Sequence, residues 1–115
     1  MGDLDLKVIR NALEIEQEML ANEIQNEKDK LDIYTEVNPD PFDLVDQRLH
    51  QEIVLNRLGY MERRFRQVRA ALKRLECGMY GICEKCDKAI NPERLKAIPY
   101  ATRCVNCQEG LERVG

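Results

Sequence analysis

Two closely spaced pairs of cysteines near the C-terminus are the residues whose spacing most directly indicates chemistry. Cys83 and Cys86 form one C-x2-C pair, and Cys104 and Cys107 form a second pair after 17 intervening residues. Two residues between the cysteines let both sulfurs of a pair turn toward one ion, and two such pairs complete a tetrahedral four-thiolate shell that suits Zn²⁺. Because a closed shell leaves no coordination position for water, we expect one structural zinc ion rather than a catalytic one.

A redox-active C-x2-C pair and an iron–sulfur cluster are the alternative interpretations of these cysteines. The absence of a thioredoxin-like βαβ pattern disfavours the redox pair, whereas four cysteines could also bind iron. The fifth cysteine, Cys77, fits no second pair, so we interpret it as a bystander thiol, with a redox-sensitive spare ligand as the alternative. The segment around the pairs is too short to fold by apolar burial alone, so we expect it to unfold without metal.

A proline-rich turn with carboxylates, at residues 36–44, is a second candidate site. Asp40 precedes Pro41, which is favoured as a first helical residue, so Asp40 is suited to cap a helix. Asp43 then falls in the first turn, where a carboxylate suits the helix dipole. Local folding does not explain the apolar Phe42 at this position, so we interpret the turn as a tip that enters a partner.

Two long helices must position these sites. Residues 3–34 contain no proline or interior glycine and carry a heptad stripe with one stutter, which predicts a helix on the order of 45 Å long. Pro39 and Pro41 interrupt it, and residues 41–76 carry a second stripe with steps of four and three. A short turn makes neighbouring helices antiparallel. The sequence therefore predicts a mainly α protein, with an antiparallel coiled-coil hairpin over residues 1–77 and a four-Cys zinc-finger knob over residues 78–115.

Within the knob, the sequence gives signals for short helices only. Asn91 and Pro92 predict the start of a helix that Pro99 ends. We expect residues 108–115 to form a short helical turn or to fray.

Composition limits the classes of function. The chain has 115 residues with a net charge of −3, which argues against a general nucleic-acid coat. No apolar run approaches the roughly 18 residues of a membrane span, and the N-terminus lacks the pattern of a secretory signal. We therefore expect a cytoplasmic protein with reduced thiols. The single histidine, His50, has no nucleophile near it in sequence and no phosphate loop is present, so we expect no enzyme.

Together these features resemble the DksA/TraR family of bacterial transcription regulators. The resemblance covers almost the whole chain. In the knob, residues 81–86, 94–99 and 104–107 are similar to the family patterns G-x-C-x-x-C, R-L-x-A-x-P and C-x-x-C. The hairpin and the acidic tip match the family's architecture, and the combination of tip and finger is more specific than either alone.

The resemblance implies a partner and a role for the tip. Family members bind RNA polymerase, insert the hairpin into its secondary channel and modulate initiation. Their tip motif is D-x-x-D-x-A, and this chain has Asp40, Asp43 and, in place of the alanine, Val45. The resemblance assigns the main effector role to Asp43, a supporting role to Asp40 and a contact to Val45.

The resemblance also implies a link to the alarmone ppGpp. At three positions where ppGpp-responsive relatives carry basic residues, we align Gln67, Ile98 and Gln108. Phosphate binding needs lysine or arginine at such positions. We therefore expect only a weak ppGpp linkage.

Two other functions remain as alternatives. A small zinc-ribbon module that binds nucleic acid is suggested by the basic residues of the knob, although the acidic net charge disfavours direct DNA binding. A basic run on the second helix, which includes Arg63, Arg64 and Arg66, is interpreted as a solvated face, as a polymerase contact or as a DNA contact. The second alternative function is an accessory to catalysis. An acidic tip could assist transcript cleavage by polymerase, as in the Gre factors, but we expect no cleavage.

Overall fold

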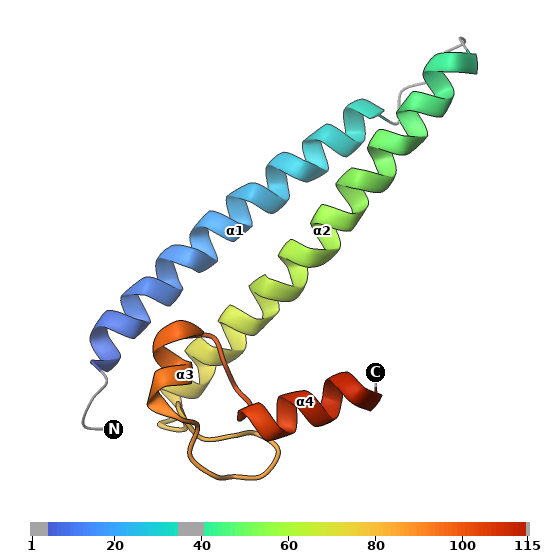
Figure 1. The fold of residues 1–115 in the computed structure, drawn as a ribbon. Helices are drawn as coiled ribbons and strands as arrows, with labels where there is room; N and C mark the ends of the chain where they lie inside the picture. The colour runs from blue at the N-terminus through green and yellow to red at the C-terminus, as the bar shows by residue number, and fades with distance from the viewer. Residues whose placement is uncertain (1–4, 35–40, 115) are drawn as a thin grey trace. The chain divides into compact units, whose positions relative to one another are not determined.

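The computed structural model describes residues 5–34 and 41–114, and the side chains of residues 5–32 and 45–111 among them. Within these ranges the chain forms four helices: α1 (Leu6–Tyr34), α2 (Pro41–Glu76), α3 (Pro92–Ala97) and α4 (Val105–Val114) (Figure 1). The β-structure in these ranges consists of one isolated antiparallel bridge between Ile82 and Ala89. The predicted mainly α fold class, with a helical hairpin and a four-cysteine segment, is confirmed.

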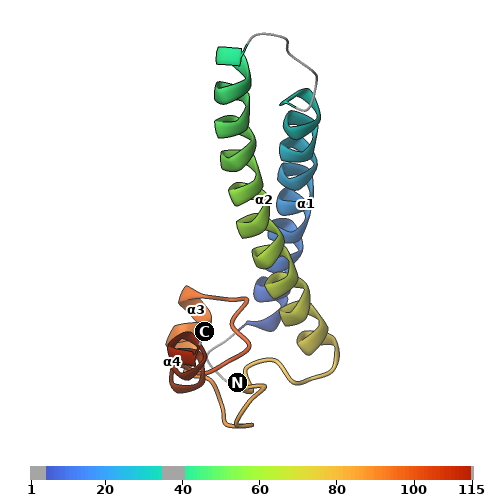
Figure 2. The same cartoon turned by 90° about the vertical axis from the view of Figure 1, so that its right-hand side faces the viewer.

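The chain divides into two units. One comprises Met1–Gln17 with Arg66–Gly115, and the other comprises Glu18–Phe65. In the second unit the C-terminal part of α1 and the N-terminal part of α2 lie side by side and run in opposite directions (Figures 1 and 2). The division at residues 77 and 78 that the sequence suggests stays a prediction.

In the unit of Glu18–Phe65, the two helices pack through the predicted stripes. Leu20, Val54 and Leu58 are buried. Glu27 occupies a polar position of the α1 stripe and is also buried. Its Oε1 lies 3.0 Å from the Nζ atom of Lys30 and 3.9 Å from Nη1 of Arg57. The other oxygen, Oε2, is buried without a hydrogen-bond partner in the part of the chain that the structure describes.

In the other unit, α1 begins later than the sequence suggests. The Oδ1 atom of Asp5 accepts hydrogen bonds from the backbone N–H groups of Lys7 at 3.0 Å and Val8 at 3.3 Å, which caps the helix. Leu6, which belongs to the predicted stripe, is 44% exposed, so this part of the prediction is wrong. Leu13 is fully buried, as expected.

The same unit contains the end of α2, which stops at the predicted residue. The backbone N–H of Met79 donates to the carbonyl of Arg74 at 2.8 Å, and Gly78 between them has a φ of 72°. This combination is a Schellman motif, in which a left-handed glycine ends the helix. Glycine favours this backbone conformation because it has no Cβ atom.

No helix in the described ranges is both long enough and apolar enough to span a membrane.

Candidate metal centre

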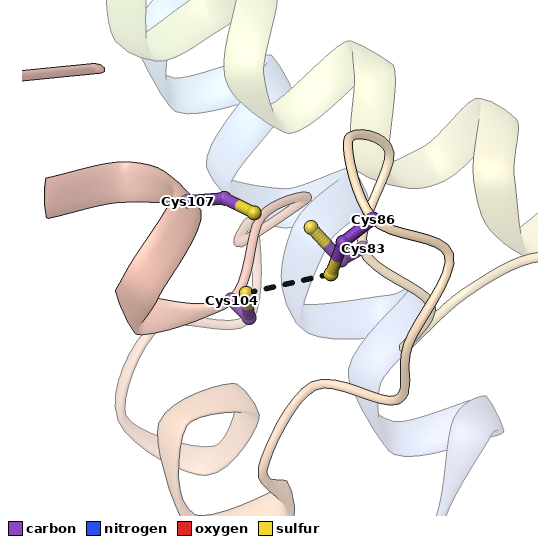
Figure 3. Close-up of side chains that lie close together, drawn as sticks. All are labelled: Cys83, Cys86, Cys104 and Cys107. Atoms are coloured by element: carbon purple, nitrogen blue, oxygen red, sulfur yellow. Dashed lines mark hydrogen bonds between the residues drawn. The ribbon is translucent and has the colours of Figure 1, made fainter. Parts of the chain in front are cut away.

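The four cysteines of the two C-x2-C pairs come together at one point. The sulfur atoms of Cys83, Cys86, Cys104 and Cys107 all lie within 4.8 Å of one another. Figure 3 shows the four side chains directed toward a common centre. The sulfurs of Cys86 and Cys104 are 3.8 Å apart, and all four residues are free thiols. The spacing of the cysteines in the sequence therefore predicted which side chains meet.

The first pair lies on a tight turn closed by backbone hydrogen bonds. The N–H of Cys83 donates to the carbonyl of Lys88 at 2.8 Å, and the N–H of Asp87 donates to the carbonyl of Cys83 at 3.0 Å. Asp87 has a φ of 60°, the left-handed conformation that aspartate tolerates better than most residues. This conformation turns the chain back, so that Ile82 and Ala89 pair as an antiparallel bridge.

The second pair lies at the N-terminus of a helix. Cys104 immediately precedes α4, and its carbonyl accepts the N–H of Gln108 at 2.9 Å. Cys107 is the third residue of α4. The expectation of at most a helical turn over residues 108–115 was too short, because the helix begins at Val105.

Interactions between the two pairs hold the turns together. The N–H of Glu84 donates to the carbonyl of Thr102 at 2.9 Å. The side chains of Glu84 and Arg103 form an ion pair, with 2.8 Å between Oε1 and Nε, although the atoms are not aligned as a hydrogen bond. The Nε–H of Arg94, on α3, donates to the carbonyl of Arg103 at 3.1 Å. These contacts join the two cysteine turns to each other and to α3.

A small apolar core lies beneath the cysteines. Ile90 and Leu95 are almost completely buried, and Tyr80 is 7% exposed. The hydroxyl of Tyr80 donates to the carbonyl of Pro99 at 2.8 Å, and burial raises the pKa of this phenol from 10.0 to about 12.

The predicted short helix is confirmed, since the side chain of Asn91 accepts the N–H of Glu93 at 2.9 Å and caps α3.

One arginine joins α2 to the first cysteine turn. The Nη2 atom of Arg74, in the last turn of α2, donates to the carbonyl of Ile82 at 2.8 Å. Ile82 directly precedes Cys83 in the chain. The hydrogen bond therefore fixes the start of the first cysteine turn against the end of the helix.

The geometry of the sulfurs fits a single tetrahedral ion. With a Zn–S bond of about 2.3 Å, the edge of a regular tetrahedron of sulfurs is about 3.8 Å. The measured Cys86–Cys104 separation has this value and is far longer than a disulfide bond. In an iron–sulfur cluster, cysteine sulfurs bound to different irons are held apart by the irons and sulfides between them, whereas all four sulfurs here lie within 4.8 Å of one another. The donor set of four thiolates suits zinc, so the chain has one structural zinc site, as predicted.

Two thiols of the site, Cys83 and Cys107, have opposite tendencies to ionise. Burial opposes ionisation of Cys83, but hydrogen bonds from backbone groups of Cys104, Cys86 and Lys85 outweigh it and lower its pKa to about 6. Hydrogen bonds with the Cys104 and Cys83 side chains, together with burial, raise the pKa of Cys107 to about 12. Ionisation of Cys107 is therefore disfavoured without a cation beside its sulfur, and a bound metal ion supplies one.

The remaining sequence-predicted residues are placed as follows. Cys77 is exposed and does not belong to the group of sulfurs in the described ranges. Asp40 lies outside the described residues. Asp43 is the third residue of α2, and its side chain is outside the described ones. Val45 lies on α2 and is 62% exposed.

Sequence reasoning missed the contacts that support the metal centre. The pairing of Glu84 with Arg103 and the bond from Arg74 to Ile82 join residues 19 and 8 positions apart. No spacing rule marks such pairs. The one available signal is that each charged residue lies next to a cysteine or next to the end of a helix.

Comparison with protein families identifies the metal-binding segment. Residues 78–113 match the family described as prokaryotic DksA/TraR C4-type zinc finger. The matched segment contains all four cysteines of the site.

Comparison with individual proteins extends beyond the finger. A protein of Aquifex aeolicus with no assigned function is 37% identical over 76 residues, which are 65% of this chain and 52% of that protein. The chain therefore spans about half the length of this relative. The RNA polymerase-binding transcription factor DksA of Caulobacter vibrioides is 29% identical over 113 residues, which are 98% of this chain and 80% of that protein.

A solved structure has the same fold. The transcription factor DksA2 of Pseudomonas aeruginosa superimposes with a TM-score of 0.79, over 97% of this chain and 92% of that chain, at 23% sequence identity. At this level of identity the likeness concerns the fold alone.

Proposed function

We propose that this chain, whose residues 78–113 match the DksA/TraR C4-type zinc-finger family, is an RNA polymerase-binding transcription regulator. The observation that carries the proposal is the match to the Caulobacter factor over 98% of this chain, which includes the hairpin as well as the finger. The protein acts by binding, in the cytoplasm where polymerase works, and has no catalysis of its own.

In this proposal the turn between α1 and α2 is the effector. It enters the secondary channel of polymerase and brings the carboxylates of Asp40 and Asp43 near the catalytic Mg²⁺. Their charge shifts the balance between conformations of the open complex, and a shift of about 1.4 kcal/mol changes occupancy tenfold. Promoters with short-lived open complexes respond most. Val45 contacts the channel, and its exposure on α2 supports this role.

The zinc ion has a structural role in this proposal. Cys83, Cys86, Cys104 and Cys107 are its ligands, and the closed shell leaves no position for a substrate. The ion fixes residues 78–113 as one rigid body at the end of α2. We expect only a weak ppGpp linkage, since Gln67, Ile98 and Gln108 supply no cation.

The nucleic-acid-binding alternative has less support. Of the basic side chains in the finger, Arg94 and Arg103 are engaged in internal contacts, and Lys96 lies 3.4 Å from a carboxylate oxygen of Glu93. Lys85 and Lys88 are exposed. These three exposed lysines, one of them beside Glu93, give little electrostatic attraction for a duplex, which normally needs a basic patch.

The first experiment measures binding to core RNA polymerase of the source organism, with a known secondary-channel factor as competitor. We expect submicromolar binding that the competitor displaces. Absence of binding by protein with an intact zinc site would contradict the proposal and favour the nucleic-acid module. Salt-sensitive binding to random DNA would point the same way.

The role of the tip is tested with Asp43→Asn in a transcription assay. This variant should bind polymerase like the parent but lose the effect on initiation, because it removes charge and leaves the helix intact. Asp46→Asn, one turn further along α2, is the matched control and should regulate normally. Regulation by Asp43→Asn equal to that of the parent would remove the tip from the mechanism.

A cleavage assay with a backtracked polymerase complex distinguishes the regulator from an accessory to transcript cleavage. A Gre-like accessory would stimulate transcript cleavage at saturating protein, and we expect no cleavage above the rate of polymerase alone.

A further inference from the structure

A stripe of exposed apolar side chains runs along α2 within the unit of Glu18–Phe65. We call the four residues that form it the outer stripe: Val45, Leu49, Ile53 and Tyr60, which are 62%, 56%, 50% and 57% exposed. Their spacings of four, four and seven residues place them on one face of the helix. Single exposed apolar residues are common, whereas several on one helix face are typical of an interaction surface. The polar Asn56 separates Ile53 from Tyr60 on this face.

The outer stripe is separate from the face that packs against α1. That face is formed by Val54 and Leu58, which are 4% and 7% exposed. At about 100° per residue, the two faces lie on nearly opposite sides of α2. The outer stripe is therefore not the edge of the packed face, and any partner that covers it comes from outside the unit.

The charges beside the outer stripe change sign along the helix. Residues 41–52 contain three acidic residues and one basic residue, whereas residues 53–65 contain three arginines and one glutamate. Asp46 lies near the N-terminal end of the stripe. Arg64 lies at the other end, where its Nη2 donates to the hydroxyl of Tyr60 at 3.0 Å and its guanidinium sits 5.6 Å from the ring centre.

We propose that the outer stripe binds the outer stripe of a second copy of this chain, with the two α2 helices antiparallel. Antiparallel pairing brings the acidic end of each segment against the basic end of the other, whereas parallel pairing would place like charges together. With Leu49 opposite Tyr60 of the second copy, Asp46 lies near Arg64 of that copy. The contact is isologous and closes as a twofold dimer.

The small size of the outer stripe sets the strength of this dimer. Four half-exposed side chains bury much less area than a standard stable interface, so the dimer is weak and depends on concentration. Val45 would be covered in it. If the proposed polymerase function holds, self-association therefore competes with entry of the tip into the channel, and this consequence alone rests on that function.

Sedimentation velocity of the zinc-loaded full chain, from about 5 to 500 µM, tests the proposal by mass action. We expect the parent to shift from monomer to dimer over this range. The double variant Leu49→Gln, Ile53→Gln should raise the dissociation constant at least about tenfold, which corresponds to about 1.4 kcal/mol. Leu55→Gln is the matched control and should change it less than about twofold, since Leu55 lies about 200° around the helix from Ile53.

Charge variants test the antiparallel orientation. Asp46→Lys and Arg64→Glu should each weaken self-association, because each creates two like-charge contacts in the homodimer. An equimolar mixture of the two variants should associate at least as well as the parent, since every such contact then joins opposite charges. Helical circular dichroism of each variant verifies that the fold is retained.

Three outcomes would overturn the proposal. They are a parent that stays monomeric over the whole range, a dimer that Leu49→Gln, Ile53→Gln leaves intact, and a mixture of charge variants that fails to associate. The experiment contains no polymerase, so its result is independent of whether the chain binds that enzyme.

Discussion

The finger and the N-terminal part of α2 differ in what their side chains contact. The charged side chains of the finger contact one another and the backbone, whereas apolar side chains of α2 face solvent. In the finger, Glu84, Arg94 and Arg103 are all engaged in contacts that hold the two cysteine turns together. Along residues 45–64 of α2, apolar side chains such as Leu49 and Tyr60 remain exposed beside charged ones. The comparison indicates that the finger is built to hold a metal and a shape, whereas this part of α2 is built to present a surface.

The largest effect expected from this difference is that of zinc removal. We expect a chelator, or Cys104→Ser, to unfold residues 78–113 while the helices of the unit Glu18–Phe65 persist, because the core of that unit contains no finger residue. Metal binding to small zinc fingers supplies about 10–16 kcal/mol, which few buried apolar residues can replace. Amide NMR spectra of the zinc-loaded and stripped chain distinguish the two parts.

Cys77→Ser is the control for this experiment, since Cys77 is exposed and lies outside the sulfur group in the described ranges. It should leave the spectrum of the finger unchanged. A cooperative, near-native melt after complete removal of zinc would contradict the prediction and show that Ile90 and Leu95 suffice as a core.

A second prediction concerns Glu27, where the helical unit departs from the pattern of a buried apolar stripe. Its Oε2 is buried without a hydrogen-bond partner in the described ranges, and its nearest cation from α2, on Arg57, is 3.9 Å away. Replacing poorly compensated buried charge by apolar volume often stabilises a protein by about 1–4 kcal/mol. We expect Glu27→Leu to raise the free energy of unfolding by about 1 kcal/mol, measured by denaturant titration of zinc-loaded protein.

Glu23→Leu provides the comparison for this substitution, because Glu23 is an exposed residue on the same helix. It should change stability by less than about 0.5 kcal/mol. A loss of stability in Glu27→Leu would mean that the pairs with Lys30 and Arg57 outweigh the desolvation of the carboxylate.

The same two regions show what could be predicted from the sequence. The metal ligands were predictable because each pair needs only two intervening residues to turn both sulfurs inward. The limits of α2 were predictable because Pro41 fixes a start and Gly78 permits an end. The Glu84–Arg103 pair was not, because it forms only after 18 intervening residues have folded between its members. The predicted stripe included Glu27, so its burial could be expected. That its Oε2 atom has no hydrogen-bond partner in the described ranges depends on side-chain packing, which the sequence does not show.

The smallest predicted effect tests the hydrogen bond that Tyr80 donates to Pro99 within the finger. We expect Tyr80→Phe to lower the free energy of unfolding of zinc-loaded protein by about 1 kcal/mol at neutral pH, as for a typical buried hydrogen bond. The raised pKa adds a dependence on pH. Folding favours the neutral phenol, so its contribution is complete below pH 10.0 and is lost as the pH rises toward about 12.

Titration of tyrosinate absorbance isolates this group. The folded parent should show a late step near pH 12 as Tyr80 ionises, and this step should disappear in Tyr80→Phe. Tyr60→Phe removes an exposed phenol on α2 and should leave the late step in place. If the late step survived in Tyr80→Phe, the closed environment would belong to another tyrosine, and the finger would be more open to solvent than its contacts indicate.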